Sequence, residues 1–469
     1  MKKSNVILSV AAVLSAAFAG AATVSVDWSV ETGPVKPVNG VGQPPMIGAL
    51  GDWSMLHYLK EAGIPYSRLH DVGGWLGGGL YVDIPNLFPD FDADETDPKN
   101  YRFAFTDSLL SALEKNGVEP FFRLGVTIEN WVYYKHVYGV PALPPQRILP
   151  PKDYAKWARI CEHVIAHYTE GWANGFRMKI SYWEIWNEPD NDVPDEKNAM
   201  FQAPFEEYIR LYGVVASHLK ARFPNLKIGG YASCGFYAAV GSDQVMGANS
   251  SPRMEHFVDC AKRFLARARD GKWPLDFFSY HSYSVPDACL RQCRYADQLL
   301  NEYGFTRDRT ERINNEWLPR PSHDMLGTAA QAAMIGAELI GFQNGPVDLA
   351  CIYDAKCGIG NYSPLFNPMT YKPHKAYYCF VAFNELRKLG KAVDCRTPDG
   401  LYAAAATDGQ GNGAVMIANI SGADQPLGGA FGDFKVVETR IIDEKRDYQV
   451  VQLPNVITDN AVLLIKLAK

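Results

Sequence analysis

Several features that mark other kinds of protein are missing from this sequence. It has no Cys-x-x-Cys pair and no spacing of cysteine and histidine that indicates a zinc site. It has no excess of basic residues: the formal net charge is −6, which excludes the charge pattern of a protein that binds nucleic acid or anionic membranes. No internal repeat or low-complexity tract occurs. We therefore expect a folded protein that requires no metal, no cofactor and no nucleic-acid partner.

The sequence has nine cysteines, an odd number that leaves at least one thiol unpaired within a monomer. In an exported protein some of them could form disulfides, and the local pairs are Cys289 with Cys293 and Cys351 with Cys357. Free cysteines buried in the core are the more common outcome. We expect mostly buried free thiols, and the pairing stays open.

Residues 1–21 have the order of a secretory signal peptide. Lys2 and Lys3 precede an apolar run that ends in small residues around Ala19 and Ala21. A membrane anchor is the alternative, but it requires about 20 apolar residues, and the small-residue cleavage pattern comes too early for one. No later segment is long and apolar enough to span a membrane. We predict an exported protein, periplasmic or secreted, without a membrane span.

The length of 469 residues predicts one large domain with a smaller one attached, since single cores rarely exceed about 250–300 residues. Short apolar runs alternate with longer helical patterns, which indicates βα units and a parallel sheet. Eight runs occur, at residues 38–42, 66–70, 119–124, 181–187, 226–230, 276–281, 312–316 and 347–353. The fold class we predict is therefore α/β, with a (β/α)₈ TIM barrel over residues 35–390 and functional groups where its strands end.

The clearest helix lies between the third and fourth runs. Its apolar residues recur every three or four positions and share one face: Tyr154, Trp157, Cys161, Val164, Ile165 and Tyr168. A doubly wound open sheet also alternates strands and helices, but it requires a glycine-rich phosphate loop behind its first strand, and no such loop occurs.

The pattern changes after a helix near residues 372–389. From about residue 391 to 469, short apolar strands alternate with Gly, Asn and Asp, which predicts an antiparallel β-sandwich domain. Residues 22–34 include another strand-like segment, which we expect to join this domain. The predicted organisation is a signal peptide, a barrel and a C-terminal β-sandwich.

Two of the predicted barrel strands end in a glutamate. WNEPD places Asn187 and Glu188 at the end of the fourth strand, and NNEW places Glu316 at the end of the seventh. Barrel closure brings both to one mouth, where two carboxylates suffice for glycoside hydrolysis: one protonates the leaving oxygen and the other attacks the anomeric carbon. Glu184 faces the same way as Glu188 because strand residues alternate, but it lies one layer below the mouth.

These motifs resemble the acid/base and nucleophile motifs of the clan of retaining glycosidases with (β/α)₈ barrels. The order of features is most similar to that of glycoside hydrolase family 39, which includes β-xylosidases and α-L-iduronidases. The similar features are VNGVG at residues 38–42, RLH at 68–70, WNEPD at 186–190, HSY at 281–283, NEW at 315–317 and the trailing β-domain. RLHDVGG and NNEW depart from the usual pattern in their neighbouring residues.

The resemblance implies a role for each matching residue. Glu188 is the acid/base and Glu316 the nucleophile, and the substrate-binding residues are Arg68, His70, Asn187, His281 and Tyr283. Each also has a structural interpretation when it is taken alone. Arg68 could close an ordinary ion pair, and a buried His or Tyr is often satisfied by backbone groups. Asn187 could serve as a turn former before Pro189.

The resemblance predicts an exported retaining glycosidase that acts by double displacement, with β-xylosidase-like exo-activity on plant-type oligosaccharides. Other substrates stay open, namely uronides, galactosides and arabinosides. Two other functions also stay open: a transglycosylase that uses the same residues, and a carbohydrate-binding protein without turnover. A retaining mechanism requires the two carboxyl groups to lie about 5–5.5 Å apart.

Overall fold

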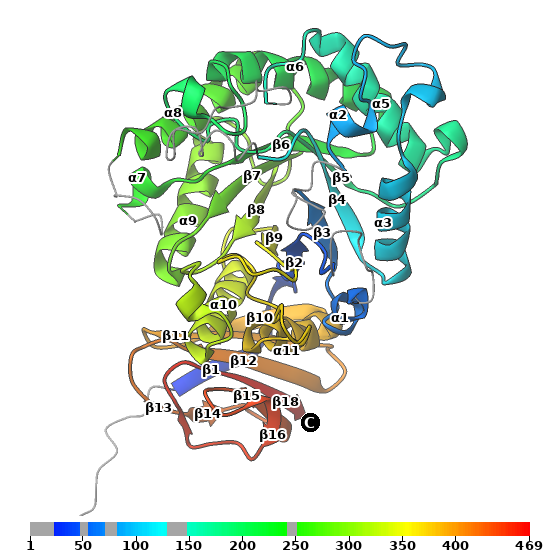
Figure 1. The fold of residues 1–469 in the computed structure, drawn as a ribbon. Helices are drawn as coiled ribbons and strands as arrows, with labels where there is room; N and C mark the ends of the chain where they lie inside the picture. The colour runs from blue at the N-terminus through cyan, green and yellow to red at the C-terminus, as the bar shows by residue number, and fades with distance from the viewer. Residues whose placement is uncertain (1–22, 47–54, 71–81, 129–147, 242–250) are drawn as a thin grey trace, which may run out of the picture.

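The computed structural model describes residues 23–46, 55–70, 82–128, 148–241 and 251–469. Figure 1 shows a closed barrel of strands surrounded by helices, with a β-domain below it. The predicted signal peptide over residues 1–21 lies outside the described residues. Among the helices that the structure describes, none has both the length and the apolar character needed to cross a bilayer.

All eight predicted barrel strands are confirmed, and they pair in parallel in chain order. Pairing of Gly40 with Cys351 closes the ring between the first strand and the last. The strands are β2 (Gly40–Gly42), β3 (Tyr66–Leu69), β4 (Glu119–Leu124), β5 (Tyr182–Ile185), β6 (Lys227–Ser233), β7 (Phe277–Ser282), β8 (Glu311–Trp317) and β9 (Leu349–Ile352). Their side chains are almost all buried, which explains why the runs are apolar throughout.

Helices cover the outside of the barrel. They are α1 (Leu56–Glu61), α3 (Ala104–Lys115), α5 (Tyr154–Thr169), α6 (Phe205–Arg222), α8 (Pro252–Asp270), α9 (Pro286–Glu302), α10 (Ala329–Asn344) and α11 (Lys375–Leu389), with short turns at α2 (Ile84–Leu87) and α7 (Tyr237–Val240). The predicted face of α5 is buried apart from a partly exposed Tyr154. Asp153 begins this helix, because its side chain accepts a hydrogen bond from the Lys156 N–H.

The barrel interior changes from apolar to polar toward the carboxyl-terminal ends of the strands. Its lower layer consists of Phe121, Tyr182, Phe277, Ile313, Leu349 and Cys351. Above it lies a polar layer of Arg68, Glu184, Ser279 and Asn315, in which Glu184 accepts hydrogen bonds from the other three. Side chains on a strand alternate, so the layers follow each other at two-residue intervals. The polar layer supports the groups at the mouth.

The predicted C-terminal β-domain is confirmed, and the N-terminal segment joins it. Its eight-stranded sheet has the order β14-β1-β10-β11-β12-β18-β15-β16, and a two-stranded sheet pairs β13 with β17. The strands are β1 (Thr23–Pro34), β10 (Lys391–Arg396), β11 (Leu401–Thr407), β12 (Asn412–Asn419), β13 (Gln425–Pro426), β14 (Gly428–Ala430), β15 (Lys435–Ile442), β16 (Asp447–Val451), β17 (Val456–Ile457) and β18 (Ala461–Ala468). All pair antiparallel except β1 with β14.

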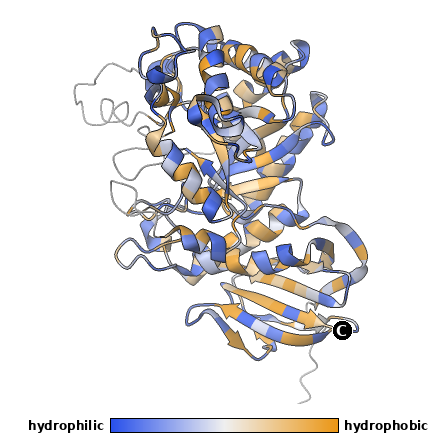
Figure 2. Ribbon diagram, turned by 90° about the vertical axis from the view of Figure 1, so that its right-hand side faces the viewer, coloured by the Kyte–Doolittle hydropathy of each residue, from blue (hydrophilic) through white to orange (hydrophobic). Residues whose placement is uncertain are grey.

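The β-domain has its own core on one face and the barrel helices on the other. Along β12, Ala414 and Met416 belong to the core shared with α10 and α11, whereas Val415 and Ile417 belong to the separate core of the β-domain. Figure 2 shows the mixture of hydrophobic and hydrophilic residues along these strands. This period of two explains how one sheet buries both faces.

All nine cysteines are free in the structure, and seven of them are buried. The two local pairs considered from the sequence are therefore not disulfides here. Burial raises the pKa of most of these thiols, for example that of Cys351 to about 12. This agrees with the expectation of free thiols in the core.

Glu338 is a buried acid in α10 at the junction between the barrel and the β-domain. It is fully buried, and neither of its carboxyl oxygens has a hydrogen-bond partner among the described residues. Burial raises its pKa well above the usual range, and a nearby Cys293 adds to the effect. The carboxyl of Glu338 is therefore neutral in the folded protein. At a pH where the unfolded chain ionises this group, the free energy of unfolding is lowered, and the loss grows as pH rises.

Replacement of Glu338 by Met should stabilise the protein at neutral pH by about 1–3 kcal/mol, because it removes an unsatisfied polar group of similar size. The unfolded carboxyl has a pKa of about 4.3, so the gain should be small at that pH and grow as pH rises toward the folded-state pKa. Urea unfolding across this pH range measures it. In the matched Glu338→Gln variant, the pH dependence that this carboxyl adds to the free energy of unfolding should disappear. If Glu338→Met instead destabilised the protein, the carboxyl would have a partner that stabilises it.

Candidate active site

Glu188 and Glu316 lie at the same mouth of the barrel. Glu316 belongs to β8, and Glu188 follows the end of β5 by three residues. Their side chains are 15% and 5% exposed, and a carboxylate oxygen of one lies within 4.8 Å of a carboxylate oxygen of the other. This close approach of two oxygens fits the about 5–5.5 Å between the carboxyl groups of retaining glycosidases better than the about 6.5–9.5 Å of inverting ones.

The turn after β5 aims Glu188 into the mouth. Trp186 points outward, where it packs against Trp157 of α5 and donates its indole N–H to the Met200 carbonyl. Trp186 and Glu188 both have positive φ angles, +73° and +43°, which cost about 1–3 kcal/mol each for such residues. Hydrogen bonds hold this conformation, since the Glu188 N–H donates to the Ala232 carbonyl at 3.1 Å.

A register shift in β8 turns Glu316 inward. Tyr280 of β7 pairs with Asn314, but the next residue, His281, pairs with Glu316, so one residue of β8 is skipped. Asn315 and Glu316 therefore both face the barrel interior, where they contact Glu184 and Arg68 respectively. The bulge changes the facing that strict alternation predicts.

Arg68 joins the polar layer to the mouth. Its Nη1 donates to Glu316 at 2.7 Å, its Nε donates to Glu184 at 2.8 Å, and its Nη2 donates to the Asn187 side-chain oxygen at 2.5 Å. Burial alone lowers the pKa of this guanidinium, but Glu184 and Glu316 outweigh burial and raise it above its ordinary value. Arg68 is therefore a permanent cation that favours the ionised form of Glu316.

His281 connects the two candidate catalytic carboxylates. Its Nδ1 lies 2.7 Å from Glu188 Oε1 and 3.3 Å from Glu316 Oε2, and its side chain is fully buried. Burial lowers the pKa of His281, but the charges of Glu316 and Glu188 and the hydrogen bond to Glu188 outweigh it and raise the pKa. For Glu188, burial raises the pKa, whereas His281 outweighs burial and lowers it.

Tyr283 contacts the carboxylate oxygen of Glu316 that Arg68 does not. Its hydroxyl donates to Glu316 Oε2 at 2.7 Å, and its ring contacts those of Tyr353 and Tyr362. Burial raises the pKa of Glu316, while His281 and Arg68 oppose it. Because Arg68 and Tyr283 both donate to this carboxylate, the contacts fit the ionised form of Glu316.

Asn187 and His70 complete the set named from the sequence. The Asn187 amide nitrogen lies 3.2 Å from His70 Nε2, which is itself 4.0 Å from Glu316 Oε1. Burial, with Arg123 and Arg68, lowers the pKa of His70 well below its usual value, so this ring is neutral. The structure thus brings all seven predicted site residues to one place. The substrate-binding roles expected of Arg68, His281 and Tyr283 stay predictions, since the contacts described here are to carboxylates.

Two residues that the sequence interpretation did not single out hold the Glu188 turn. Asn191 donates its amide to Glu188 Oε2 at 2.8 Å. Asp190 is fully buried and accepts a hydrogen bond from the Ser233 hydroxyl at 3.0 Å, which ties the turn to β6. Burial and the neighbouring Glu188 raise the pKa of Asp190 to about 7. Their place directly after WNEP was the only sequence signal for either.

Among the described acidic, histidine and cysteine side chains, one group lies close enough together to hold a metal ion. It consists of Glu188, His281 and Glu316. Arg68 and Tyr283 already donate to Glu316, and Asn191 donates to Glu188. A neighbouring guanidinium repels a metal cation. These donors fit the sharing of a proton better than the binding of a metal.

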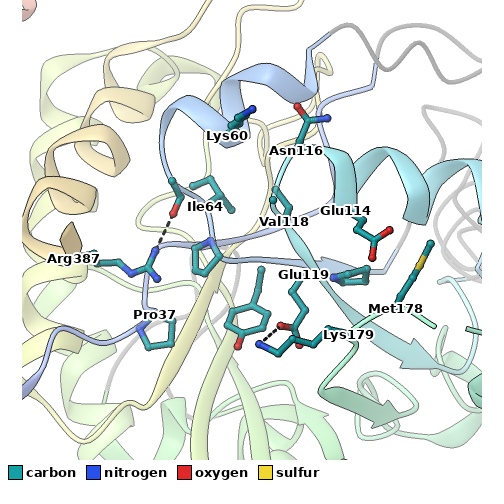
Figure 3. Close-up of a pocket in the computed structure, with 15 residues that line it drawn as sticks. Pro37, Lys60, Ile64, Glu114, Asn116, Val118, Glu119, Met178, Lys179 and Arg387 are labelled. Carbon is teal, nitrogen blue, oxygen red and sulfur yellow. Dashed lines mark hydrogen bonds and ion pairs between the residues drawn. The ribbon is translucent and has the colours of Figure 1, made fainter. Parts of the chain in front are cut away.

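A hollow of about 780 Å³ lies at the other end of the barrel, before the strands begin. Figure 3 shows Lys60, Glu119, Lys179 and Arg387 around it, with Lys179 paired to Glu119. Arg387 donates to the Gly63 carbonyl at 2.8 Å. None of the seven predicted site residues lines this hollow, and barrel enzymes use the opposite face. Volume alone therefore does not locate the active site.

A protein-family model matches the part of the chain that contains these motifs. The model of glycosyl hydrolases family 39 matches residues 52–324, more than half of the 469 residues. The chain belongs to glycosyl hydrolases family 39. The matched span contains every predicted site residue from Arg68 to Glu316. The predicted membership is thereby confirmed, and with it membership of a retaining family.

Two curated relatives of this family 39 member are β-xylosidases. One, from Geobacillus stearothermophilus, is 28% identical over 290 residues, which cover 56% of this chain and 51% of the relative. The other, from Caldicellulosiruptor saccharolyticus, is 25% identical over 263 residues, which cover 56% of this chain and 45% of the relative. The chain spans about half the length of the curated relatives it matches.

Solved structures share the whole architecture. A glucosidase from Croceicoccus marinus superposes with a TM-score of 0.72 at 20% identity, covering 96% of this chain and 99% of that one. A monomeric β-xylosidase from Caulobacter crescentus gives 0.66 at 16% identity, covering 96% and 99%. At these identities the likeness shows the fold alone, including both the barrel and the β-domain.

Proposed function

We propose that this family 39 member is a retaining β-glycosidase with β-xylosidase-like exo-activity on plant-type oligosaccharides. The observation that carries the proposal is the pair of carboxylates within 4.8 Å, one of them held by Arg68 and Tyr283. Glu316 attacks the anomeric carbon while Glu188 protonates the glycosidic oxygen. Glu188 then deprotonates water, which releases the sugar with its configuration retained.

Two observations support a neutral β-xyloside over a uronide. The curated relatives are named β-xylosidases. The described cations near the mouth already have partners. Arg68 pairs with Glu184 and Glu316, Arg253 donates to the Asn191 carbonyl and lies near Asp192, and Lys356 lies 3.6 Å from Asp354. A uronide carboxylate needs a cation that the enzyme's own carboxylates do not already neutralise.

A panel of 4-nitrophenyl α- and β-linked pentosides, hexosides and uronides tests the proposal. We expect kcat/KM for the β-xyloside to exceed that for the β-glucoside by about tenfold or more, since the extra hydroxymethyl group must fit the same pocket. NMR of the first-formed product should show the β-anomer. Preference for a uronide would assign another substrate, and absence of turnover on the whole panel would favour a binding protein. Predominant transfer to an added acceptor sugar would indicate a transglycosylase.

Export is part of the same proposal. Its support is the sequence of residues 1–21, with two lysines, an apolar run and small residues. We expect the mature protein recovered from an expressing bacterium to begin close to residue 22, and N-terminal sequencing measures this. A mature chain that retains Met1 would contradict export by this signal.

A further inference from the structure

We propose that in the free enzyme His281 holds the exchangeable proton of the active site, and that it delivers this proton through Glu188 to the leaving group. This inference rests on the proposed glycosidase function and adds a third member to its catalytic pair. His281 then acts on the carboxylates and not, as the sequence resemblance implied, on the sugar.

The geometry leaves one nitrogen for this role. His281 Nδ1 is 2.7 Å from Glu188 Oε1 and 3.3 Å from Glu316 Oε2, whereas Nε2 is buried and has no hydrogen-bond partner among the described residues. The shorter contact is a charge-assisted hydrogen bond. Glu316 Oε2 already accepts the Tyr283 hydroxyl, so the shared proton lies between His281 and Glu188.

The charge balance favours an imidazolium. Arg68 is shared between Glu184 and Glu316, so with a neutral His281 the three carboxylates Glu184, Glu188 and Glu316 would have only one positive charge to balance them. Other groups also face the site. The neutral His70 after β3, the Tyr283 and Tyr362 hydroxyls, the Cys234 thiol and Asp190 lie around the carboxylates, and the more distant cations are Arg253, whose charge acts on Glu188, and Arg123 and Lys356, whose charges act on His70. Burial lowers the pKa of His281, but nearby charges outweigh burial and raise it. Among these charges, that of Glu316 has the largest effect.

Formation of the glycosyl-enzyme removes that influence, because Glu316 becomes a neutral ester. In the same step, as the glycosidic C–O bond breaks, the His281 Nδ1–H bond breaks while the Glu188 Oε1–H bond forms, and Glu188 passes this proton to the departing oxygen. His281 is left as the neutral Nε2–H form. In the second step Glu188 takes a proton from water and returns it to Nδ1. His281, Glu188 and Glu316 together carry a net charge of −1 both in the free enzyme and in the intermediate, so the net charge of the buried site does not change.

Titration of His281 by NMR of the ¹⁵N-histidine-labelled full chain tests this directly. In the free enzyme we expect its imidazole to titrate above the ordinary value of about 6.5, and in the glycosyl-enzyme trapped with a 2-deoxy-2-fluoro-glycoside we expect the midpoint to fall below it. The trapping sugar is whichever one the aryl glycoside panel identifies. A neutral ring in the free enzyme, or a midpoint that trapping leaves unmoved, overturns the proposal. The free-enzyme titration needs no substrate, so it is independent of the choice of sugar.

The His281→Asn variant adds a kinetic test. It keeps a neutral donor but cannot hold the proton, so kcat/KM for a phenyl glycoside should fall by about 10²–10⁴-fold, with a much smaller loss for the 2,4-dinitrophenyl glycoside. The basic limb of the pH profile should move to lower pH, because Glu188 alone then holds the proton. Tyr283→Phe, the matched control, should slow both substrates similarly and leave the basic limb in place. The proposal is wrong if His281→Asn lowers kcat/KM equally for both substrates and leaves the basic limb of the pH profile in place. His281 would then only position its neighbours.

Discussion

Glu316→Ala should abolish turnover on every substrate, with kcat lower by about 10⁴-fold or more, whatever the leaving group. Without this carboxylate no covalent intermediate can form. Activated aryl glycosides should not rescue the variant, because the missing step is the attack and not the protonation. Steady-state rates with 4-nitrophenyl and 2,4-dinitrophenyl glycosides measure the effect.

The strand that carries Glu316 offers its own control. Glu311 lies at the other end of β8, where it pairs with Lys227 and accepts the Tyr182 hydroxyl. Glu311→Gln should therefore leave kcat close to the wild-type value while changing a glutamate of the same strand. If Glu316→Ala kept a substantial rate on the activated substrate, another group would have to be the nucleophile. Circular dichroism of both variants separates loss of function from loss of fold.

The barrel was predictable because each of its strands is buried on both faces. Such strands consist almost entirely of apolar residues, so the eight runs stood out, and all eight were confirmed. The site was predictable for a related reason. A glutamate after Trp186 and Asn187 interrupts an apolar run at its end, which is where barrel enzymes place their chemistry.

The details that sequence could not supply depend on register. Strict alternation from Ile313 places Asn315 inward and Glu316 outward, and only the shift between β7 and β8 turns Glu316 into the barrel. The WNEPD turn depends likewise on contacts between strands, namely Glu188 with Ala232 and Asp190 with Ser233. No local pattern encodes a contact between neighbours in space. A resemblance to known enzymes named the residues, and the structure shows which groups they contact.

The polar layer explains why so many charges can be buried beneath the site. Glu184 has the same facing as Glu188 but contacts Arg68, Ser279 and Asn315 below the mouth. It thereby neutralises one side of Arg68, whose other donors reach Glu316 and Asn187. Glu184 lies too deep in the barrel to be the catalytic acid, but through Arg68 it helps to hold the nucleophile Glu316 in place. Removal of one partner from such a buried pair costs about 3–5 kcal/mol.

Glu188→Ala should have the second largest effect, and its size should depend on the substrate. The first step with a 2,4-dinitrophenyl glycoside needs no protonation, so it should remain fast, and the glycosyl-enzyme should accumulate because no base activates water. With an unactivated disaccharide the loss should be about 10²–10⁴-fold. Burst kinetics and mass spectrometry of the trapped intermediate measure these two outcomes.

Azide then distinguishes the roles of the two glutamates chemically. A small anion needs no general base, so added azide should restore turnover of Glu188→Ala by attacking the glycosyl-enzyme from the face that water uses. Two inversions have then occurred, and the product should be the β-glycosyl azide, with retained configuration. An α-azide from Glu188→Ala, together with a β-azide from Glu316→Ala, would exchange the roles assigned to the two residues. Asn191 donates to Glu188 Oε2, so Asn191→Ala is the matched variant: it keeps the carboxyl and should neither accumulate the intermediate nor need azide.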